Sequence, residues 1–238
     1  FKRLFENYSK IQKNKKKFWI NMISENFKKR TYTSLTLILI LFLMLFLKPI
    51  LLYFLIIIGI FSIIEFSDLI KTINIKFIPK LFYNLIFILF IFIFCLLFFI
   101  FSNIIEFKII LFSLLLTCIA SDIGGYIFGK TFKGPKITKI SPNKTISGSI
   151  GSIILSCITL SGILFLMTKN INFIIILTGF ITSLFCQIGD LFFSLLKRKA
   201  KKKDTGNLLP GHGGILDRVD GIMFGVPAGF IFLLIFLR

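Results

Sequence analysis

Long runs of apolar residues with almost no charge are the feature that most constrains how this chain can fold. Residues 50–66, 81–101 and 173–187 are such runs, and 56% of the 238 residues are hydrophobic. A segment that crosses the hydrocarbon core of a bilayer needs about 20 mostly apolar residues. Because backbone in lipid must satisfy its own hydrogen bonds, we expect these runs to be helices. The sequence therefore predicts an all-α, polytopic integral membrane protein.

We expect about seven transmembrane helices. The predicted spans are residues 34–47, 50–66, 81–101, 104–128, 149–167, 171–196 and 219–237. Lys48 and Pro49 separate the first two, because proline inside a helix removes a hydrogen bond and clashes with the preceding turn. Residues 1–31 form a basic arm, and residues 32–238 form the membrane-embedded domain. The arm is either an interfacial amphipathic helix or a solvated segment that fixes the topology.

The net charge of +19 is distributed unevenly among the loops. With the N-terminus in the cytoplasm, all but four of the 29 lysines and arginines fall on the cytoplasmic side, as the positive-inside rule expects. The exceptions are Lys48, Lys108, Lys169 and Arg238. The excess charge then reflects orientation and attraction to anionic membrane lipids, so we expect no nucleic-acid partner. The expected location is the bacterial inner membrane, with the polar loops in the cytoplasm.

The most unusual chemistry is concentrated in residues 194–221, between the last two apolar runs. The titratable residues of this stretch are Lys197, Arg198, Lys199, Lys201, Lys202, Lys203, Asp204, His212, Asp217, Arg218 and Asp220. Its glycines and Pro210 disfavour a helix and leave backbone amides free to turn toward an anion. Cations, free amides and clustered carboxylates together predict a metal-bound phosphate site.

Asp190 lies inside the sixth predicted span, about 10 Å from the cytoplasmic end at 1.5 Å per residue. An ionised carboxylate at that depth must be paired, bound to a metal or wetted. Ser183, Gln187, Asp190 and Ser194 recur at helical spacing and form a polar stripe that lines a cavity or faces another helix. A salt bridge to a basic loop is the alternative for Asp190.

Asp217 and Asp220 are three residues apart at the start of the seventh span, so they share a helical face. Either could simply cap the helix N-terminus. Close to Asp190 they would repel one another unless a divalent cation lies among them. Oxygen ligands and a phosphate substrate favour Mg²⁺ as that cation. Glu65 and Asp68, at the end of the second span, are interpreted as interfacial residues.

A second polar region begins with Asp122 in the fourth span and continues through the loop that holds Ser141 and Lys144. The Ser-Pro-Asn-Lys-Thr sequence of residues 141–145 makes Lys144 the best phosphate-binding candidate of this loop, with a purely topological role as the alternative. The spacing of a P-loop is absent. His212, flanked by glycines, could be a base, a phosphate ligand or a hydrogen-bond donor within the loop.

Small residues in the spans are interpreted as packing residues. Gly221, Gly225 and Gly229 recur every four residues, a spacing that lets helices approach closely, and Gly125 and Gly129 share it. The four cysteines, Cys95, Cys118, Cys157 and Cys186, lie in apolar spans with no close pair in the sequence, and we expect them to pack rather than to bind zinc.

The stretch from Ser194 to Asp220 resembles the signature of the phosphatidate cytidylyltransferases, also called CDP-diacylglycerol synthases, with every fixed position filled. The resemblance continues upstream through Gly189-Asp190, residues 141–145 with Gly148, and Asp122 with Tyr126. Gly125, before that tyrosine, is a mild departure. It covers roughly the C-terminal half of the chain, whereas the N-terminal half agrees only in being hydrophobic.

The resemblance implies an Mg²⁺-dependent transfer of CMP from CTP to phosphatidate by a membrane enzyme that is often a homodimer. It implies that Asp190 and Asp217 are metal ligands, with Asp220 close by. Binding of the triphosphate or the lipid phosphate would fall to Lys197, Arg198, Lys203, His212 and Arg218. Lys203 and His212 would also be catalytic, together with the three aspartates. Asp122 and Lys144 would line the same polar cavity, and Ser141 would be a further substrate-binding residue.

Two other functions remain open from the sequence. A CTP-dependent lipid or polyprenol kinase would transfer the γ-phosphate instead, and is not expected to carry the whole pattern of residues 194–220. An ion-coupled transporter could use Asp122 and Asp190 as ion ligands, but the inverted repeats or broken helices typical of that class are not evident.

Overall fold

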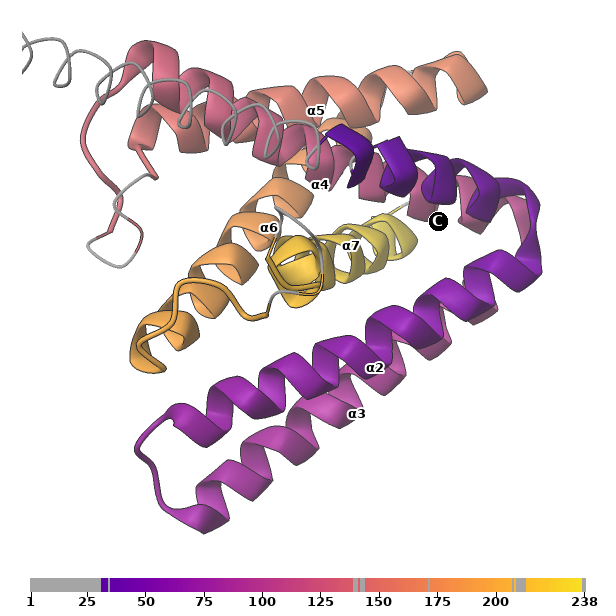
Figure 1. Cartoon of the computed structure of the whole chain (residues 1–238). Helices are drawn as coiled ribbons and strands as arrows, with labels where there is room; N and C mark the ends of the chain where they lie inside the picture. The colour runs from indigo at the N-terminus through magenta and orange to yellow at the C-terminus, as the bar shows by residue number, and fades with distance from the viewer. Residues whose placement is uncertain are drawn as a thin grey trace, which may run out of the picture.

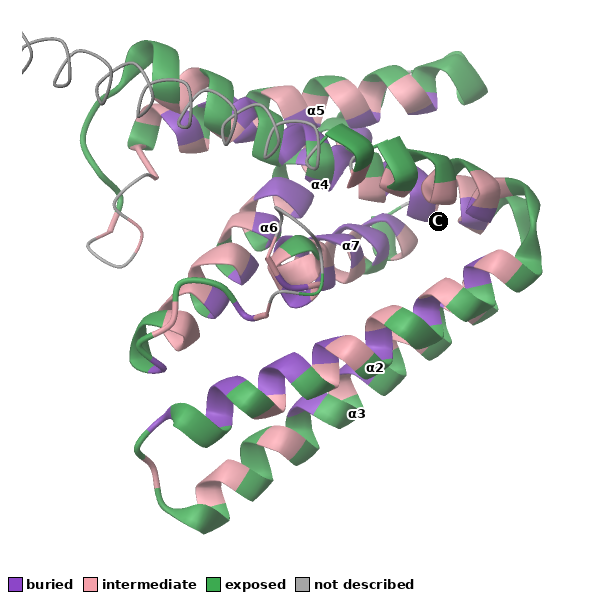
Figure 2. Cartoon of the chain, viewed as in Figure 1, coloured by how far each residue is buried: buried purple, intermediate pink, exposed green. Residues whose placement is uncertain are grey.

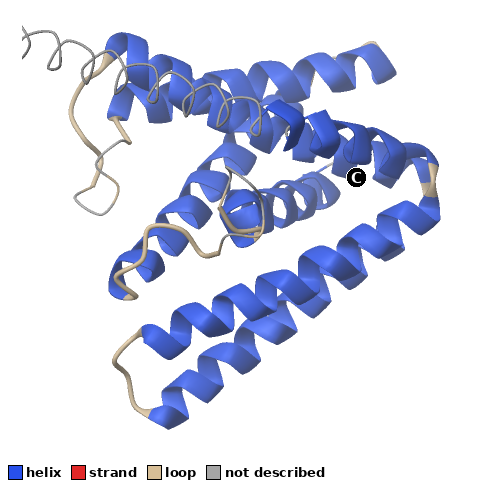
Figure 3. Ribbon diagram, in the orientation of Figure 1, coloured by secondary structure: helices blue, strands red, loops and turns tan. Residues whose placement is uncertain are grey.

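A computed structural model describes residues 31–33, 35–138, 141, 144–170, 172–206, 208 and 213–236. In these residues the fold is helical, without a named strand, as the sequence predicts (Figure 3). Six helices are long and apolar enough to cross a membrane. They are α2 (Lys48–Thr72), α3 (Phe77–Phe101), α4 (Ile105–Phe132), α5 (Ile146–Thr168), α6 (Phe173–Lys199) and α7 (Leu216–Phe236).

The expected count of seven spans is therefore approximate. The described residues contain one further apolar helix, Thr31–Phe46, which is shorter than the six. At 1.5 Å per residue it is about 24 Å long, less than the roughly 30 Å of a hydrocarbon core. The predicted arm, residues 1–31, lies almost wholly outside the described residues.

The helices extend further than the apolar runs that predicted them. α2 begins at Lys48 with Pro49 in its first turn, where the missing amide proton of proline is not needed, and it ends at Thr72 rather than at residue 66. α4 continues to Phe132. Hydropathy marks the part of a helix that lies in lipid, whereas the helix itself continues until its backbone hydrogen bonds end.

The helices form two outer pairs around an inner one (Figure 1). α4 packs extensively on α5, α6 packs on α7, and α5 also contacts α6. The α2–α3 hairpin lies on the other side of α6 and α7 (Figure 1). The α2–α3, α4–α5 and α6–α7 loops lie at the same end of the helices, on the left of the view (Figure 1). They share this end because the chain crosses the bundle twice between one of these loops and the next.

Burial follows this arrangement (Figure 2). Leu114 of α4, Leu160 of α5 and Met223 of α7 are completely buried. α3 is the least buried of the six and exposes large apolar side chains such as Phe77 and Phe92. A soluble protein rarely exposes so much apolar surface, so this face fits a lipid environment.

The glycines of α7 are packing residues, as predicted. A Cβ atom on Gly221 would lie 2.6 Å from Cys186 Sγ, and one on Gly225 would lie 2.8 Å from Cys118 Sγ. A Cβ on Gly229 would overlap the Thr182 side chain. Because these three glycines have no Cβ atom, α7 can approach α6 and α4 closely. This close packing brings the polar residues at the loop end of the helices together.

Candidate active site

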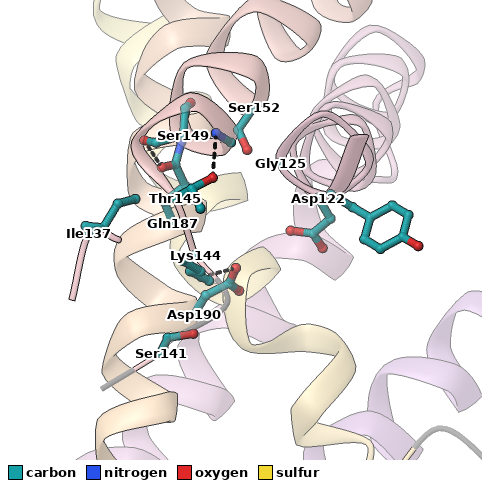
Figure 4. Close-up of a pocket in the computed structure, with 12 residues that line it drawn as sticks. Asp122, Gly125, Ile137, Ser141, Lys144, Thr145, Ser149, Ser152, Gln187 and Asp190 are labelled. Carbon is teal, nitrogen blue, oxygen red and sulfur yellow. Dashed lines mark hydrogen bonds and ion pairs between the residues drawn. The ribbon is translucent and has the colours of Figure 1, made fainter. Parts of the chain in front are cut away.

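A polar cavity of about 250 Å³ opens between α4, α6 and the start of α5 (Figure 4). It is lined by Asp122, Gly125, Tyr126, Ile137, Ser141, Lys144, Thr145, Gly148, Ser149, Ser152, Gln187 and Asp190. Asp122 and Lys144, which the resemblance assigns to one cavity, are thus brought together with Asp190, and Ser141 lines the same cavity. The lining residues belong to the C-terminal part of α4, the segment before and at the start of α5, and the C-terminal part of α6.

Lys144 and Asp190 form the central contact of the cavity. Lys144 Nζ donates to Asp190 Oδ2 at 2.8 Å, and both side chains are partly buried. The loop holds the lysine there by local backbone pairing, in which Ile137 N donates to Lys144 O at 3.0 Å and Ile146 N donates to Pro135 O at 3.0 Å. The next residue, Thr145, caps α5 by accepting from Gly148 N. The ion pair that was the alternative for Asp190 is therefore present.

The polar stripe of α6 faces α4 and α5, as its spacing predicts. The Ser183 and Ser121 hydroxyls are 2.9 Å apart. Gln187 accepts from Ser149 Oγ at 2.5 Å and donates to Ser183 Oγ at 3.2 Å. These contacts pair the polar groups with one another in an apolar region. Asp190, the next residue of the stripe toward the end of α6, borders the cavity instead.

Three carboxylates from three helices surround this point. Ligand atoms of Asp122, Asp190 and the Cys186 thiol lie within 4.8 Å of one another, and Figure 4 shows Asp122 directed toward Asp190. Asp220 is in electrostatic contact with both aspartates. Its backbone lies against Gly189, where a Cβ would come 2.6 Å from Asp220 O. The described residues thus form an acidic group, Asp122, Asp190 and Asp220, that could hold a divalent cation.

Three cations act on this acidic group. The charges of Lys144 and Arg218 act on Asp122, and the charge of Lys197 acts on Asp220. Because Lys197 is already paired with Asp217, the three carboxylates of the group keep a net negative charge, which favours a bound metal ion. The carboxylate oxygens suit a hard cation such as Mg²⁺ better than the one thiol suits a soft one.

Asp217 occupies a different environment from Asp190. Its Oδ1 accepts from Lys197 Nζ at 2.7 Å, in a pair whose side chains are only 13% and 7% exposed. Its Oδ2 accepts from Thr205 N at 2.8 Å, Thr205 Oγ1 at 3.0 Å and Gly214 N at 3.1 Å. Both oxygens of Asp217 therefore hold the loop between α6 and α7 in place.

Glu65 of α2 is a participant that sequence reasoning missed. It was interpreted as interfacial, yet it is only 4% exposed. Its carboxylate accepts from Thr205 Oγ1 at 2.6 Å, Ile215 N at 3.0 Å and Leu216 N at 2.9 Å. The signal was available, because Glu65 lies within an apolar run, and the rule applied to Asp190 holds for any intramembrane carboxylate. We call Glu65, Lys197, Thr205 and Asp217 the loop anchor.

The remaining predicted residues belong neither to the acidic group nor to the loop anchor. Arg198 and Lys203 are exposed, and Arg198 makes a long contact of 3.5 Å with Lys202 O. Arg218 is exposed beside the acidic group. His212 lies outside the described residues, so its predicted role stays a prediction.

Comparison with known proteins identifies the family of the chain. The sequence model of the cytidylyltransferase family matches residues 80–236. The chain belongs to the cytidylyltransferase family. The match includes the whole cavity and every member of the loop anchor except Glu65.

Bacterial phosphatidate cytidylyltransferases are similar to part of this chain. A phosphatidate cytidylyltransferase of Staphylococcus haemolyticus is 46% identical over 120 residues, 50% of this chain and 46% of that protein. One from Helicobacter pylori is 38% identical over 125 residues, 52% of this chain and 47% of that protein. One from Mycobacterium leprae is 44% identical over 117 residues, 48% of this chain and 36% of that protein. The aligned segment thus spans about half the length of these relatives or less.

Proposed function

We propose that this protein is a phosphatidate cytidylyltransferase, which converts CTP and phosphatidate into CDP-diacylglycerol and pyrophosphate. The observation that carries the proposal is the polar cavity, where Lys144 and Asp190 meet at 2.8 Å beside two further aspartates, in a member of the cytidylyltransferase family. The names of the bacterial relatives support the choice of phosphatidate as the acceptor.

The position of the cavity suits a reaction between a soluble nucleotide and a membrane lipid. CTP is charged and reaches the protein from water, whereas phosphatidate keeps its acyl chains in the bilayer. The residues that line the cavity lie on spanning-length helices near the ends that carry the basic loops, a position that both substrates can reach. The basic loops at this end support a cytoplasmic location by the positive-inside rule, and the bacterial relatives support the inner membrane.

In the proposed reaction, a phosphate oxygen of phosphatidate attacks the α-phosphorus of CTP. A new phosphorus–oxygen bond forms, the bond from the α-phosphorus to the bridging oxygen breaks, and pyrophosphate leaves with the bonding electron pair. The attacking oxygen is already anionic, so no general base is required. Repulsion between the two anions is the main barrier. Lys144, held at the cavity wall by Asp190, lowers it by compensating phosphate charge.

Mg²⁺ is the cation we propose for the acidic group. Asp122, Asp190 and Asp220 would hold it through their oxygens, and when bound it would neutralise phosphate oxygens. The predicted metal role of Asp217 would require that residue to exchange Lys197 for the cation, and it remains a prediction. Lys197, Arg198, Lys203, His212 and Arg218 would contact the phosphates of CTP or of the lipid from the loop and the start of α7.

The position of a radioactive label in CTP tests the proposal. Purified protein in micelles receives phosphatidate, Mg²⁺ and CTP labelled at either the α- or the γ-phosphate. We expect α-label in the lipid product and γ-label in pyrophosphate. A lipid kinase would give γ-label in lipid and release CDP, and that result with a lipid alcohol as acceptor would replace the proposal.

A further inference from the structure

Glu65 has an environment unlike that of the other described carboxylates. It has no ion pair among the described residues, yet it is nearly fully buried. Apolar neighbours exclude water around it: Phe66 stacks on Phe87 with ring centres 3.9 Å apart, and Leu69 and Leu216 are completely buried in the same cluster. A buried carboxylate is unfavourable unless donors replace its hydration. Those donors come entirely from the α6–α7 loop and the start of α7.

The contacts of Glu65 close the loop at both ends. Thr205, near the start of the loop, donates through its hydroxyl, and Ile215 and Leu216, at its end, donate through their amides. The last two are amides at the N-terminus of α7, which need acceptors from outside their own helix. A carboxylate also interacts favourably with the positive end of a helix. Glu65 therefore caps α7 from a helix that is about 150 residues away in sequence.

Two glycines provide the space that this carboxylate occupies. A Cβ on Gly206 would lie 2.7 Å from Glu65 Oε1. A Cβ on Gly214 would overlap both the Thr205 hydroxyl and the Glu65 carboxylate. The loop sequence is thus fitted to Glu65, which indicates a specific contact and not the chance burial of an interfacial residue.

The same contacts connect α2 to the acidic group. Asp217 lies one residue after Leu216 and shares the Thr205 hydroxyl with Glu65. Asp220 follows within one turn of α7 and is in electrostatic contact with Asp190 and Asp122. A shift at the start of α7 would therefore move Asp220 relative to Asp190.

We propose that Glu65 is a positioning residue, which fixes the α6–α7 loop and the start of α7 and so sets the place of Asp217 and Asp220 relative to Asp190. Its consequence for turnover rests on the proposed cytidylyltransferase function. Its consequence for the loop does not, so the two can be measured separately.

Hydrogen exchange tests the effect on the loop without any substrate. Peptides that cover residues 204–217 are followed by mass spectrometry in wild type and Glu65→Ala. We expect exchange at the Ile215 and Leu216 amides to accelerate by about tenfold or more, because they lose a buried acceptor. Glu65→Gln keeps one carbonyl acceptor and should give a smaller increase. Unchanged exchange in a folded Glu65→Ala protein would overturn the proposal.

Turnover tests the effect on the active site. We expect Glu65→Ala to lower kcat by about tenfold or more with little change in KM for phosphatidate, since Glu65 does not touch the cavity. Faster exchange with unchanged kcat would contradict the positioning role. If wild type itself makes no CDP-diacylglycerol, the proposed function fails, and the exchange result alone decides whether Glu65 holds the loop.

Three further variants separate a specific effect of Glu65 from a general loss of folding. Thr205→Val removes only the shared hydroxyl, so it should give a smaller increase in hydrogen exchange and a smaller loss of kcat. Thr205→Ser keeps the hydroxyl and should behave like wild type in both measurements. Asp68→Asn is the matched control on α2, because Asp68 is an exposed acid on the same helix whose described ion pair is with Lys71 at 3.1 Å. It should change neither exchange nor kcat. Equal effects of Asp68→Asn and Glu65→Gln would refute a specific role for Glu65.

Discussion

The cavity around Asp190 and the loop anchor around Asp217 are two carboxylate sites built from neighbouring segments, and they differ in how completely they are satisfied. Asp190 contacts one lysine and borders a cavity of about 250 Å³. Asp217 uses both oxygens in four contacts with the loop and Lys197. Carboxylate oxygens that border a cavity can bind a ligand, whereas oxygens that already accept several hydrogen bonds from the protein hold the loop backbone in place. Two aspartates to which the resemblance gives the same metal role therefore have different surroundings in this structure, and the metal role of Asp217 stays a prediction.

The largest effect should come from Asp190→Asn. Asparagine keeps the shape but loses the charge that holds Lys144 and that would hold a cation. We expect turnover to fall by about 10²–10³-fold, the usual loss when a key electrostatic contact of the transition state is removed. Folding, followed by thermal unfolding in micelles, should change little. Near-normal turnover would remove Asp190 from the active site and leave the cavity without its proposed role.

Asp217→Asn should affect stability more than any variant in the cavity. It leaves Lys197 buried without its charge partner and weakens the contacts to Thr205 and Gly214. Removing one member of a buried ion pair costs about 3 kcal/mol or more, so we expect a clear fall in the unfolding temperature. If Asp217→Asn were as stable as wild type, the distinction between an open site and a structural one would fail.

Lys144→Ala should reduce turnover by about 10²-fold, because the cavity loses a cation that compensates phosphate charge. Lys136→Ala is the matched control, since Lys136 belongs to the same basic loop but is exposed and does not line the cavity. Steady-state kinetics with CTP as the varied substrate compares them. Equal, small losses in the two variants would mean that Lys144 serves topology alone.

The smallest effects should come from single alanine substitutions of Lys199 and Lys201. Both are exposed, and neither lines the cavity or belongs to the loop anchor. We expect turnover within about twofold of wild type, because isolated surface charges contribute little. Lys197→Ala, which breaks the anchor, should instead lower stability. A loss for Lys201→Ala as large as that for Lys144→Ala would extend the active site onto the loop surface.

The parts of this structure that could be predicted from sequence are those with a local signal. The apolar runs predict the membrane helices, and the spacing of Ser183, Gln187 and Asp190 predicts a polar stripe whose partners the structure supplies. The sequence predicts both Lys144 and Asp190 as site residues, although only the fold shows that they are in contact.

What could not be predicted depends on contacts between distant segments. The three donors to Glu65 lie about 140 to 150 residues further along the chain, so no local sequence pattern predicts these hydrogen bonds. Likewise, Asp217 and Asp190 look alike in the sequence, and only the positions of Thr205, Gly214 and Lys197 distinguish them. Sequence spacing identifies residues that share a helix face. The number of hydrogen bonds that a carboxylate accepts depends instead on how the loop folds around it.

The central claim is that the cavity carboxylates, with Asp190 at their centre, form the site for the divalent cation and the nucleotide. The most direct test is the shift in unfolding temperature on adding Mg²⁺ and CTP, measured in wild type and in Asp190→Asn. A ligand stabilises only the state that binds it, so we predict a clear upward shift in wild type and none in Asp190→Asn. A full shift in Asp190→Asn would contradict the claim and would place the ligand site elsewhere in the protein.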